Sequence, residues 1–265
     1  MRIPNAIAVS NACTGLKYNY RVAISGEYAF LQHALQRGEI ELHGQFLLGS
    51  NYTFLVHVHY QGETYPAVYK PCRGEQPLWD FPENTLAGRE VAAYLVSEAL
   101  GWRFVPYTVM REDGPFGPGS LQRYIPYDPN YHYFNFSVQD KARLRPVALF
   151  DLLCNNADRK GSHILIELHT RNLWLIDHGL CFHEEDKLRT VLWDFAGQDI
   201  PPDLLNDLER FRAHLDSDPG LLADLGRYLT PGELTALAAR ADALLQSGVY
   251  PLPPPDRRAF PYPPL

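Results

Sequence analysis

The sequence predicts an α+β protein with a bilobal fold, in which an antiparallel sheet with one helix precedes a mainly helical C-terminal lobe. Two observations carry this prediction. Between residues 39 and 70, apolar and polar side chains alternate as in half-buried strands, and turn-forming triplets interrupt the alternation. Beyond residue 137, the sequence instead carries signals for helix starts and stops. We place residues 1–125 in the first lobe and residues 126–265 in the second.

Three strands are predicted at the start of the first lobe, over residues 39–47, 54–60 and 64–70. In the second of them, apolar and polar side chains alternate with the two-residue period of a strand that has one buried face. Gly49-Ser50-Asn51 and Gln61-Gly62-Glu63 are turn-forming triplets between the strands. The expected arrangement is an antiparallel meander.

A helix follows, beginning near Thr85 as a candidate N-cap and ending at Leu100, with Gly101 as its stop. Two further strands are expected over residues 104–111 and 121–125. A segment rich in glycine and proline joins them, which is typical of a turn.

The second lobe begins with a helix near Ser137, where Ser137 and Asp140 have the spacing of a capping box. Pro146 should kink or restart this helix. A short hairpin is predicted from residues 163–168 and 173–176. Three more helices with start or stop signals follow over Pro201–His214, Asp218–Tyr228 and Thr230–Gln246.

The last part of the sequence, residues 250–265, is rich in proline and is expected to be extended. Two roles are open for this segment. It either packs across the surface of the second lobe or acts as a ligand for an SH3-type domain.

Composition narrows the class of protein. Of 265 residues, 46% are apolar and 21% are charged, which is ordinary for a globular protein. The net charge of −7 argues against a general nucleic-acid binder, because neutralising phosphates needs a clustered basic surface. No apolar run approaches the ~18 residues expected of a membrane span. The four cysteines form no CxxC pair, so we expect reduced thiols in a cytoplasmic protein. We also expect a monomer with no nucleic-acid or membrane partner.

A lysine and a glutamate form the first candidate pair of site residues. Lys70 ends the third strand on the same face as Val68. Two roles are open for it: it holds a nucleotide phosphate, or it lies at the strand end without a specific role. Glu90 falls in the apolar stripe of the following helix, where a carboxylate is costly unless a cation pairs with it. Lys70 is the candidate cation, and the alternatives are Arg89, Arg103 or exposure to solvent. A strand lysine paired with a helix glutamate positions ATP phosphates in kinases.

The strongest local signal is a polar loop, residues 155–163, followed by a hairpin that ends in an Asp-His-Gly turn. Such a loop and turn can direct Asp158 and Asp177 to one place. In phosphoryl transfer, one aspartate accepts or orients the proton of the attacking hydroxyl and a second holds the metal that bridges the phosphates. Arg159 and Lys160 either steer an anionic substrate or solvate the loop.

The chain resembles the phosphatidylinositol 3-/4-kinase-like superfamily, in particular a bacterial group of actinobacterial type, and it is similar to HipA-type serine kinases. The resemblance spans most of residues 40–185. It implies a protein-kinase-like fold that binds ATP and Mg²⁺ or Mn²⁺. The segments that carry it are Gly49-Ser50-Asn51, Ala67-Val68-Tyr69-Lys70-Pro71, Gly88-Arg89-Glu90, Gly119-Ser120-Leu121-Gln122, Asn156-Ala157-Asp158-Arg159 and Ile176-Asp177-His178-Gly179.

The resemblance implies how the nucleotide is held. Lys70 contacts the α- and β-phosphates and pairs with Glu90. The other cofactor-binding positions are the small turn residues near the phosphates and the hinge that hydrogen-bonds the adenine edge, namely Ser50, Asn51, Gln122, Tyr124 and Ile125.

The resemblance also implies the catalytic and metal-binding residues. Asp158 matches the catalytic aspartate, Asp177 matches the metal-binding aspartate of the Asp-Phe-Gly position, and Asn156 matches the asparagine of the HipA-type Asn-x-Asp. One position departs, because His163 stands where these families place a metal-binding asparagine. Imidazole suits Mn²⁺ or Zn²⁺ better than Mg²⁺, so His163 is either a metal ligand that changes the preferred ion or a structural histidine.

Two functions stand open. The first is an ATP-dependent kinase that acts on a hydroxyl group of a protein or small molecule, and the second is a pseudokinase that binds nucleotide without phosphoryl transfer. The presence of Lys70, Glu90, Asp158 and Asp177 favours the first function. His163 leaves the second open, as does the loop at Gly49-Ser50-Asn51, which is much less glycine-rich than in protein kinases. Lipid phosphorylation is least favoured, since the sequence has no basic patch or amphipathic anchor for a membrane.

Overall fold

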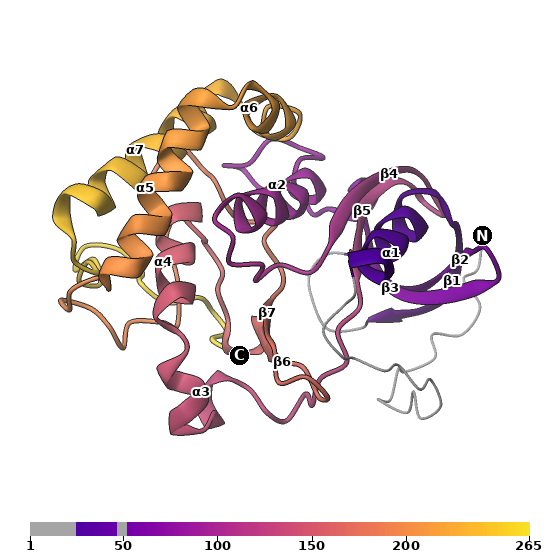
Figure 1. Cartoon of the computed structure of the whole chain (residues 1–265), viewed down its shortest axis with the longest axis horizontal. Helices are drawn as coiled ribbons and strands as arrows, with labels where there is room; N and C mark the ends of the chain where they lie inside the picture. The colour runs from indigo at the N-terminus through magenta and orange to yellow at the C-terminus, as the bar shows by residue number, and fades with distance from the viewer. Residues whose placement is uncertain (1–24, 47–51) are drawn as a thin grey trace. The chain divides into compact units, whose positions relative to one another are not determined.

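The computed structural model describes residues 25–46 and 52–265, which form two compact units. The first unit holds the described residues up to Ala87 together with Pro106–Ile125. The second unit holds Gly88–Val105 and Pro126–Leu265. Figure 1 shows the elements of both units in chain order. Residues 88–105, which we expected in the first lobe, group with the second unit.

The first unit is a five-stranded antiparallel sheet with one helix (Figure 1). The strand order is β1-β2-β3-β5-β4, so the first three strands form the predicted meander. The hairpin of β4 and β5 is tighter than predicted, because Gly114 pairs directly with Gly117. The strands are β1 (Glu39–Phe46), β2 (Thr53–Tyr60), β3 (Glu63–Pro71), β4 (Thr108–Gly114) and β5 (Gly117–Arg123).

Helix α1 (Ser25–Arg37) was not among the predicted elements. Its Ala34 and Leu35 are fully buried. The guanidinium of Arg111 on β4 donates to the carbonyl oxygens of Leu35, at 2.7 Å, and Gly38, at 2.9 Å. Arg111 therefore satisfies acceptors that no N–H group within the helix can reach at its C-terminal end.

Strand β3 is the central strand of this sheet and carries Lys70 near its end. Ala67 and Tyr69 are fully buried on one face, whereas Lys70 lies on the opposite face and is half-buried. The register places Lys70 opposite Ser120 of β5. The side of the strand on which Lys70 lies agrees with the alternation in the sequence.

The second unit is mainly helical and contains one short hairpin (Figure 1). Its core lies along α4, and α7 packs against both α4 and α5. None of the helices in the described ranges is long and apolar enough to cross a membrane. The elements are α2 (Leu86–Ala99, whose first two residues belong to the first unit), α3 (Val138–Ala142), α4 (Arg145–Cys154), β6 (Ile164–Ile166), β7 (Leu173–Leu175), α5 (Pro202–Ser217), α6 (Pro219–Leu225) and α7 (Pro231–Ser247), with 3₁₀ turns at Tyr133–Asn135 and Gly161–His163. A further 3₁₀ turn, Cys72–Gly74, belongs to the first unit.

Several helix ends follow the predicted signals. The Ser137 hydroxyl accepts from the Asp140 N–H at the start of α3, and Pro146 lies in the first turn of a new helix, α4. Thr230 and Glu233 form the capping box of α7. Gly248 ends that helix in the left-handed conformation, with φ of 61°.

The start of α2 differs from the prediction, because Glu75 rather than Thr85 caps it. The Thr85 hydroxyl donates to the Pro82 carbonyl, while the N–H groups of Leu86 and Ala87 donate to the Glu75 carboxylate at 3.1 and 2.8 Å. A carboxylate at this position also meets the positive end of the helix dipole.

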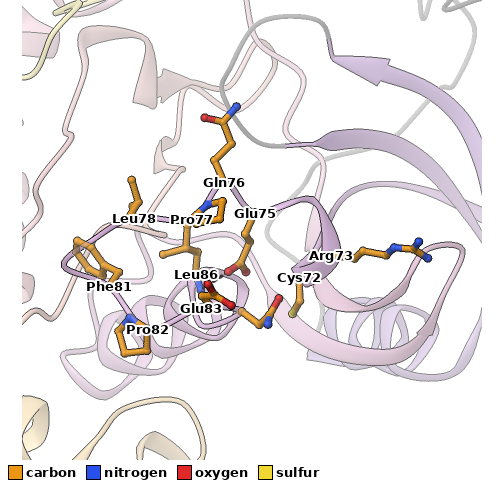
Figure 2. Close-up of a pocket in the computed structure, with 11 residues that line it drawn as sticks. Cys72, Arg73, Glu75, Gln76, Pro77, Leu78, Phe81, Pro82, Glu83 and Leu86 are labelled. Carbon is orange, nitrogen blue, oxygen red and sulfur yellow. Dashed lines mark hydrogen bonds between the residues drawn. The ribbon is translucent and has the colours of Figure 1, made fainter.

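Glu75 lines a cavity of about 100 Å³ beside this helix start (Figure 2). Leu86 and Phe81, both buried, line it together with Cys72. Burial raises the pKa of the Cys72 thiol to about 11, which keeps it protonated and unreactive at neutral pH.

We expect Glu75→Ala to lower the free energy of unfolding by about 1 kcal/mol, because two N–H groups at the start of α2 lose their acceptor. Urea denaturation of the variant measures the loss. Glu83→Ala is the matched control, since Glu83 lines the same cavity but is exposed. Equal stability of the two variants would refute the capping role of Glu75.

Candidate active site

The candidate catalytic loop, residues 155–163, starts where α4 stops. Asn155 adopts the left-handed conformation, with φ of 53°, which asparagine tolerates better than most residues. Its side-chain amide donates to the carbonyl oxygens of His183, at 2.9 Å, and Glu185, at 2.7 Å, and its oxygen accepts from the Lys187 N–H at 3.0 Å. These bonds hold both the end of the helix and the direction in which the loop leaves.

Asn156 fixes the backbone of Asp158. Its Oδ1 accepts from the Asp158 N–H at 2.9 Å, which is an Asx turn. Its own N–H donates to the Asp151 carbonyl at 3.0 Å. Asn156 therefore positions the backbone of Asp158 in the structure.

Asp158 projects from this turn with 27% of its side chain exposed. Its Oδ2 lies 3.2 Å from the Lys160 ammonium. Burial raises the pKa of Asp158, Lys160 opposes this shift, and the negative charge of Asp177 adds to it. A carboxylate with a raised pKa is a better proton acceptor than an ordinary aspartate.

Asp177 follows β7 in a left-handed conformation, with φ of 62°, and is about half exposed. Its Oδ2 lies 3.2 Å from Nε2 of His163, which is buried at the end of the loop. The Ile176 N–H donates to the His163 carbonyl at 3.1 Å and ties the turn to the loop. The structure thus brings His163 and Asp177 into contact, with Asp158 within electrostatic reach of Asp177.

Within residues 25–46 and 52–265, no group of three or more His, Cys, Asp or Glu side chains is arranged to hold a metal ion. Asp177 and His163 nevertheless supply an adjacent oxygen and nitrogen donor. A divalent cation that bridges phosphates needs only one or two protein ligands, because phosphate and water oxygens complete its shell. These two residues fit such an ion, and an imidazole donor favours Mn²⁺.

Arg159 does not steer a substrate or solvate the loop, because its side chain is fully buried. Its Nε donates to Asp151 Oδ1 at 2.9 Å, and Asp151 is itself fully buried on α4. Its Nη1 donates to the Ile176 carbonyl at 2.9 Å, one residue before Asp177. Arg159 therefore joins α4, the catalytic loop and the Asp177 turn.

The protonation of His178 follows from the same guanidinium. Arg159 Nη2 lies 2.8 Å from His178 Nε2, and a guanidinium can only donate, so Nε2 accepts and the ring proton is on Nδ1. The His178 backbone N–H donates to Glu90 Oε2 at 2.9 Å, and Nδ1 lies 3.8 Å from the same oxygen. A buried polar chain thus runs from Asp151 through Arg159 and His178 to Glu90. Sequence reasoning missed it, although Asp151 within the apolar run of α4 was a signal.

No family model matches this sequence. The chain is 39% identical over 287 residues to "Protein Rv2133c" of Mycobacterium tuberculosis, an alignment that covers 95% of this chain and 99% of that protein. The chain belongs to the Rv2133c family.

The fold of this Rv2133c family member is similar to that of solved structures with low sequence identity. The structure of hydra Fam20 with sugar matches with a TM-score of 0.51 and 15% identity, over 86% of this chain and 89% of that one. The Helicobacter pylori proinflammatory kinase CtkA gives a TM-score of 0.48 and 13% identity, over 81% of this chain and 94% of that one. The predicted class, an α+β kinase-like fold with an N-terminal antiparallel sheet and a helical C-terminal part, is confirmed.

Glu90 in this Rv2133c family member is buried, as its place in an apolar helical stripe predicts. The neighbouring Arg89 guanidinium, also buried, pairs with Glu233 of α7. Lys70 belongs to the first unit and Glu90 to the second, so the pairing of Lys70 with Glu90 stays a prediction.

The predicted adenine-binding positions lie on β5 and directly after it. Gln122 is buried on β5 and donates to the Thr108 hydroxyl at 2.8 Å. The Tyr124 N–H donates to the Pro66 carbonyl at 3.2 Å, and Ile125 is buried at the end of the first unit. Ser50 and Asn51, the candidate phosphate-binding turn residues, lie outside the described residues.

Proposed function

We propose that this protein is an ATP-dependent phosphotransferase of the kinase type, which acts on a hydroxyl group of a protein or small molecule with Mg²⁺ or Mn²⁺. One observation supports it most: the loop after α4 and the turn after β7 bring Asp158, Asp177 and His163 together. The sequence resemblance to the phosphatidylinositol 3-/4-kinase-like superfamily supports the same activity.

In this proposal, Asp158 accepts the proton of the acceptor hydroxyl. Its raised pKa and its position on a turn held by Asn156 support this role. Lys160, 3.2 Å from the Asp158 carboxylate, supplies positive charge beside the transferred phosphoryl group.

Asp177 and His163 hold the divalent cation, which when bound offsets the charge of the ATP phosphates. Lys70 contacts the phosphates and pairs with Glu90, and Ser50 and Asn51 are further phosphate-binding residues in this proposal. The segment with Gln122, Tyr124 and Ile125 binds adenine. Glu90 also holds the turn after Asp177 through the His178 N–H, so it serves the metal-binding turn directly.

ATP binding is expected to require a divalent cation, because the Asp177 carboxylate and the phosphates otherwise repel each other. Asp177→Asn should weaken metal-dependent ATP binding by about tenfold or more, whereas the matched Asp158→Asn should leave it nearly unchanged. Calorimetry with Mg²⁺, with Mn²⁺ and with a chelator measures both. The absence of ATP binding with either ion would end the nucleotide proposal.

A pseudokinase is the second candidate, because His163 stands where the families that the chain resembles place a metal-binding asparagine. His163→Asn is expected to shift the metal preference from Mn²⁺ toward Mg²⁺ without loss of fold, since it exchanges a nitrogen donor for an oxygen donor. ATP turnover with each ion measures the shift. ATP binding without turnover by wild type in both ions would establish the pseudokinase.

A further inference from the structure

The proline-rich segment 257–265 lies across the second unit and reaches the candidate catalytic loop. The Ala259 carbonyl accepts from the Thr190 N–H and from the Trp193 indole N–H, both at 3.1 Å. The Pro264 carbonyl accepts from the Gly161 N–H at 2.8 Å. Figure 1 shows this yellow segment ending beside β6 and β7. Of the two roles open for the segment, the structure shows packing on the second unit.

The segment is held mainly through its backbone rather than by large side chains. Only Ala259 and Pro261 are buried within residues 257–265, whereas Phe260 is 50% and Tyr262 is 80% exposed. Arg257 adds two side-chain contacts, because it donates to the Leu188 carbonyl at 2.7 Å and pairs with Asp186 at 2.5 Å. Extended peptides are often recognised in this way: their main-chain carbonyls accept hydrogen bonds from the receiving surface, and small apolar side chains anchor them.

The surface that holds the segment is connected to buried residues of the second unit. The Thr190 hydroxyl donates to the fully buried Asp151 carboxylate at 3.0 Å, and Asp151 pairs with Arg159. These contacts fix the position of Thr190, whose N–H donates to the Ala259 carbonyl. A Cβ on Gly161 would lie 2.9 Å from the Phe134 ring, which is half-exposed and covers this glycine. Two aromatic side chains, Phe134 and Trp193, thus accompany the N–H donors, which is typical of surfaces that bind proline-rich segments.

We propose that this surface, formed by Gly161, Thr190 and Trp193, is a binding site for proline-rich polypeptide segments. The chain's own residues 257–264 fill it in cis, and a proline-rich segment of a partner protein displaces them. Gly161 lies in the same loop as Asp158, so the partner binds directly to the candidate catalytic loop. A tethered segment competes at an effective concentration of about 1 mM, so the partner binds measurably only when the cis contact is weakened or the partner is concentrated.

Pro261→Glu tests the site in the full chain, because a carboxylate cannot stay in the buried position of Pro261 and the segment should leave. Pro255→Glu is the matched control, since it makes the same change at an exposed proline that precedes the segment. Calorimetry with a synthetic peptide of residues 255–265 should show one binding site in Pro261→Glu, with an affinity about tenfold or more above that of wild type and Pro255→Glu. The readout is binding alone, so the result does not depend on phosphoryl transfer.

Arg257→Ala provides a second variant that leaves both buried residues in place. It should bind the peptide with an affinity between those of wild type and Pro261→Glu, because it loses only the contact with Leu188 and the ion pair with Asp186. Adding Trp193→Phe to either variant should weaken peptide binding, since the indole donor is lost. Failure of both released variants to bind the peptide, or equal affinity in all proteins including wild type, would overturn the proposal.

Discussion

Asp158→Asn is expected to lower kcat for phosphoryl transfer by about 10²- to 10⁴-fold, because asparagine cannot accept the proton of the attacking hydroxyl. The KM for ATP should stay close to the wild-type value, since Asp177 and His163 rather than Asp158 are proposed to hold the metal. Steady-state kinetics with saturating Mn²⁺ measures both constants. A variant with wild-type turnover would show that Asp158 is not the base.

The same variant should not be less stable than wild type at pH 7. Burial raises the pKa of Asp158 in the folded state above that of the unfolded chain, so its ionised form costs stability. For a raised pKa, the stabilising contribution is present below the unfolded pKa and is lost as the pH rises through the folded pKa. Asparagine removes that cost. Urea denaturation at pH 4 and pH 7 separates this effect from a fall in kcat caused by misfolding.

Arg159→Met is expected to lower the free energy of unfolding by about 3–5 kcal/mol, because it leaves the Asp151 carboxylate buried without a cation. Both side chains are fully buried, so water cannot solvate the charge that remains when one partner is removed. Thr190 still donates to Asp151, but one hydroxyl does not balance a charge. Urea denaturation of the variant at pH 7 measures the loss.

The loss in Arg159→Met should depend on pH and on Asp151. Burial raises the pKa of Asp151 and the Arg159 guanidinium opposes the shift, so without Arg159 the variant should be more stable at pH 5 than at pH 8. The control Asp151→Asn/Arg159→Met should recover much of the loss, since no charge is left buried. A loss below about 1 kcal/mol in the single variant, or no recovery in the double variant, would contradict the account.

The sequence predicted most of the first sheet because its strands obey local rules. The alternation in residues 54–60 and 64–70 places Lys70 on its observed side of β3. Helix α1 was missed although Leu31, Ala34 and Leu35 have helical spacing and Gly38 follows its last residue. Its C-terminal end also contacts Arg111, 76 positions beyond Leu35. Contacts between residues so distant in sequence leave no mark in local periodicity.

Part of the candidate site was also predicted from local sequence, and part depends on contacts between distant residues. Asp158 and Asp177 were predicted from their loop and turn, and their electrostatic coupling is consistent with that prediction. The burial of Arg159 was not predicted, because a charged residue between polar neighbours in a loop is usually solvated. Its partner Asp151 lies in another element, and only the fold brings the two together.

The Asp151–Arg159 pair also constrains how sequences of this family diverge. Loss of either residue alone leaves an unpaired charge buried in the core. A lineage that replaces the two residues one after the other therefore passes through a single-substitution sequence that folds poorly. Selection against that intermediate acts even if the double replacement folds well. The two positions are therefore expected to be inherited together, and a homologue that lacks one of them should lack the other as well.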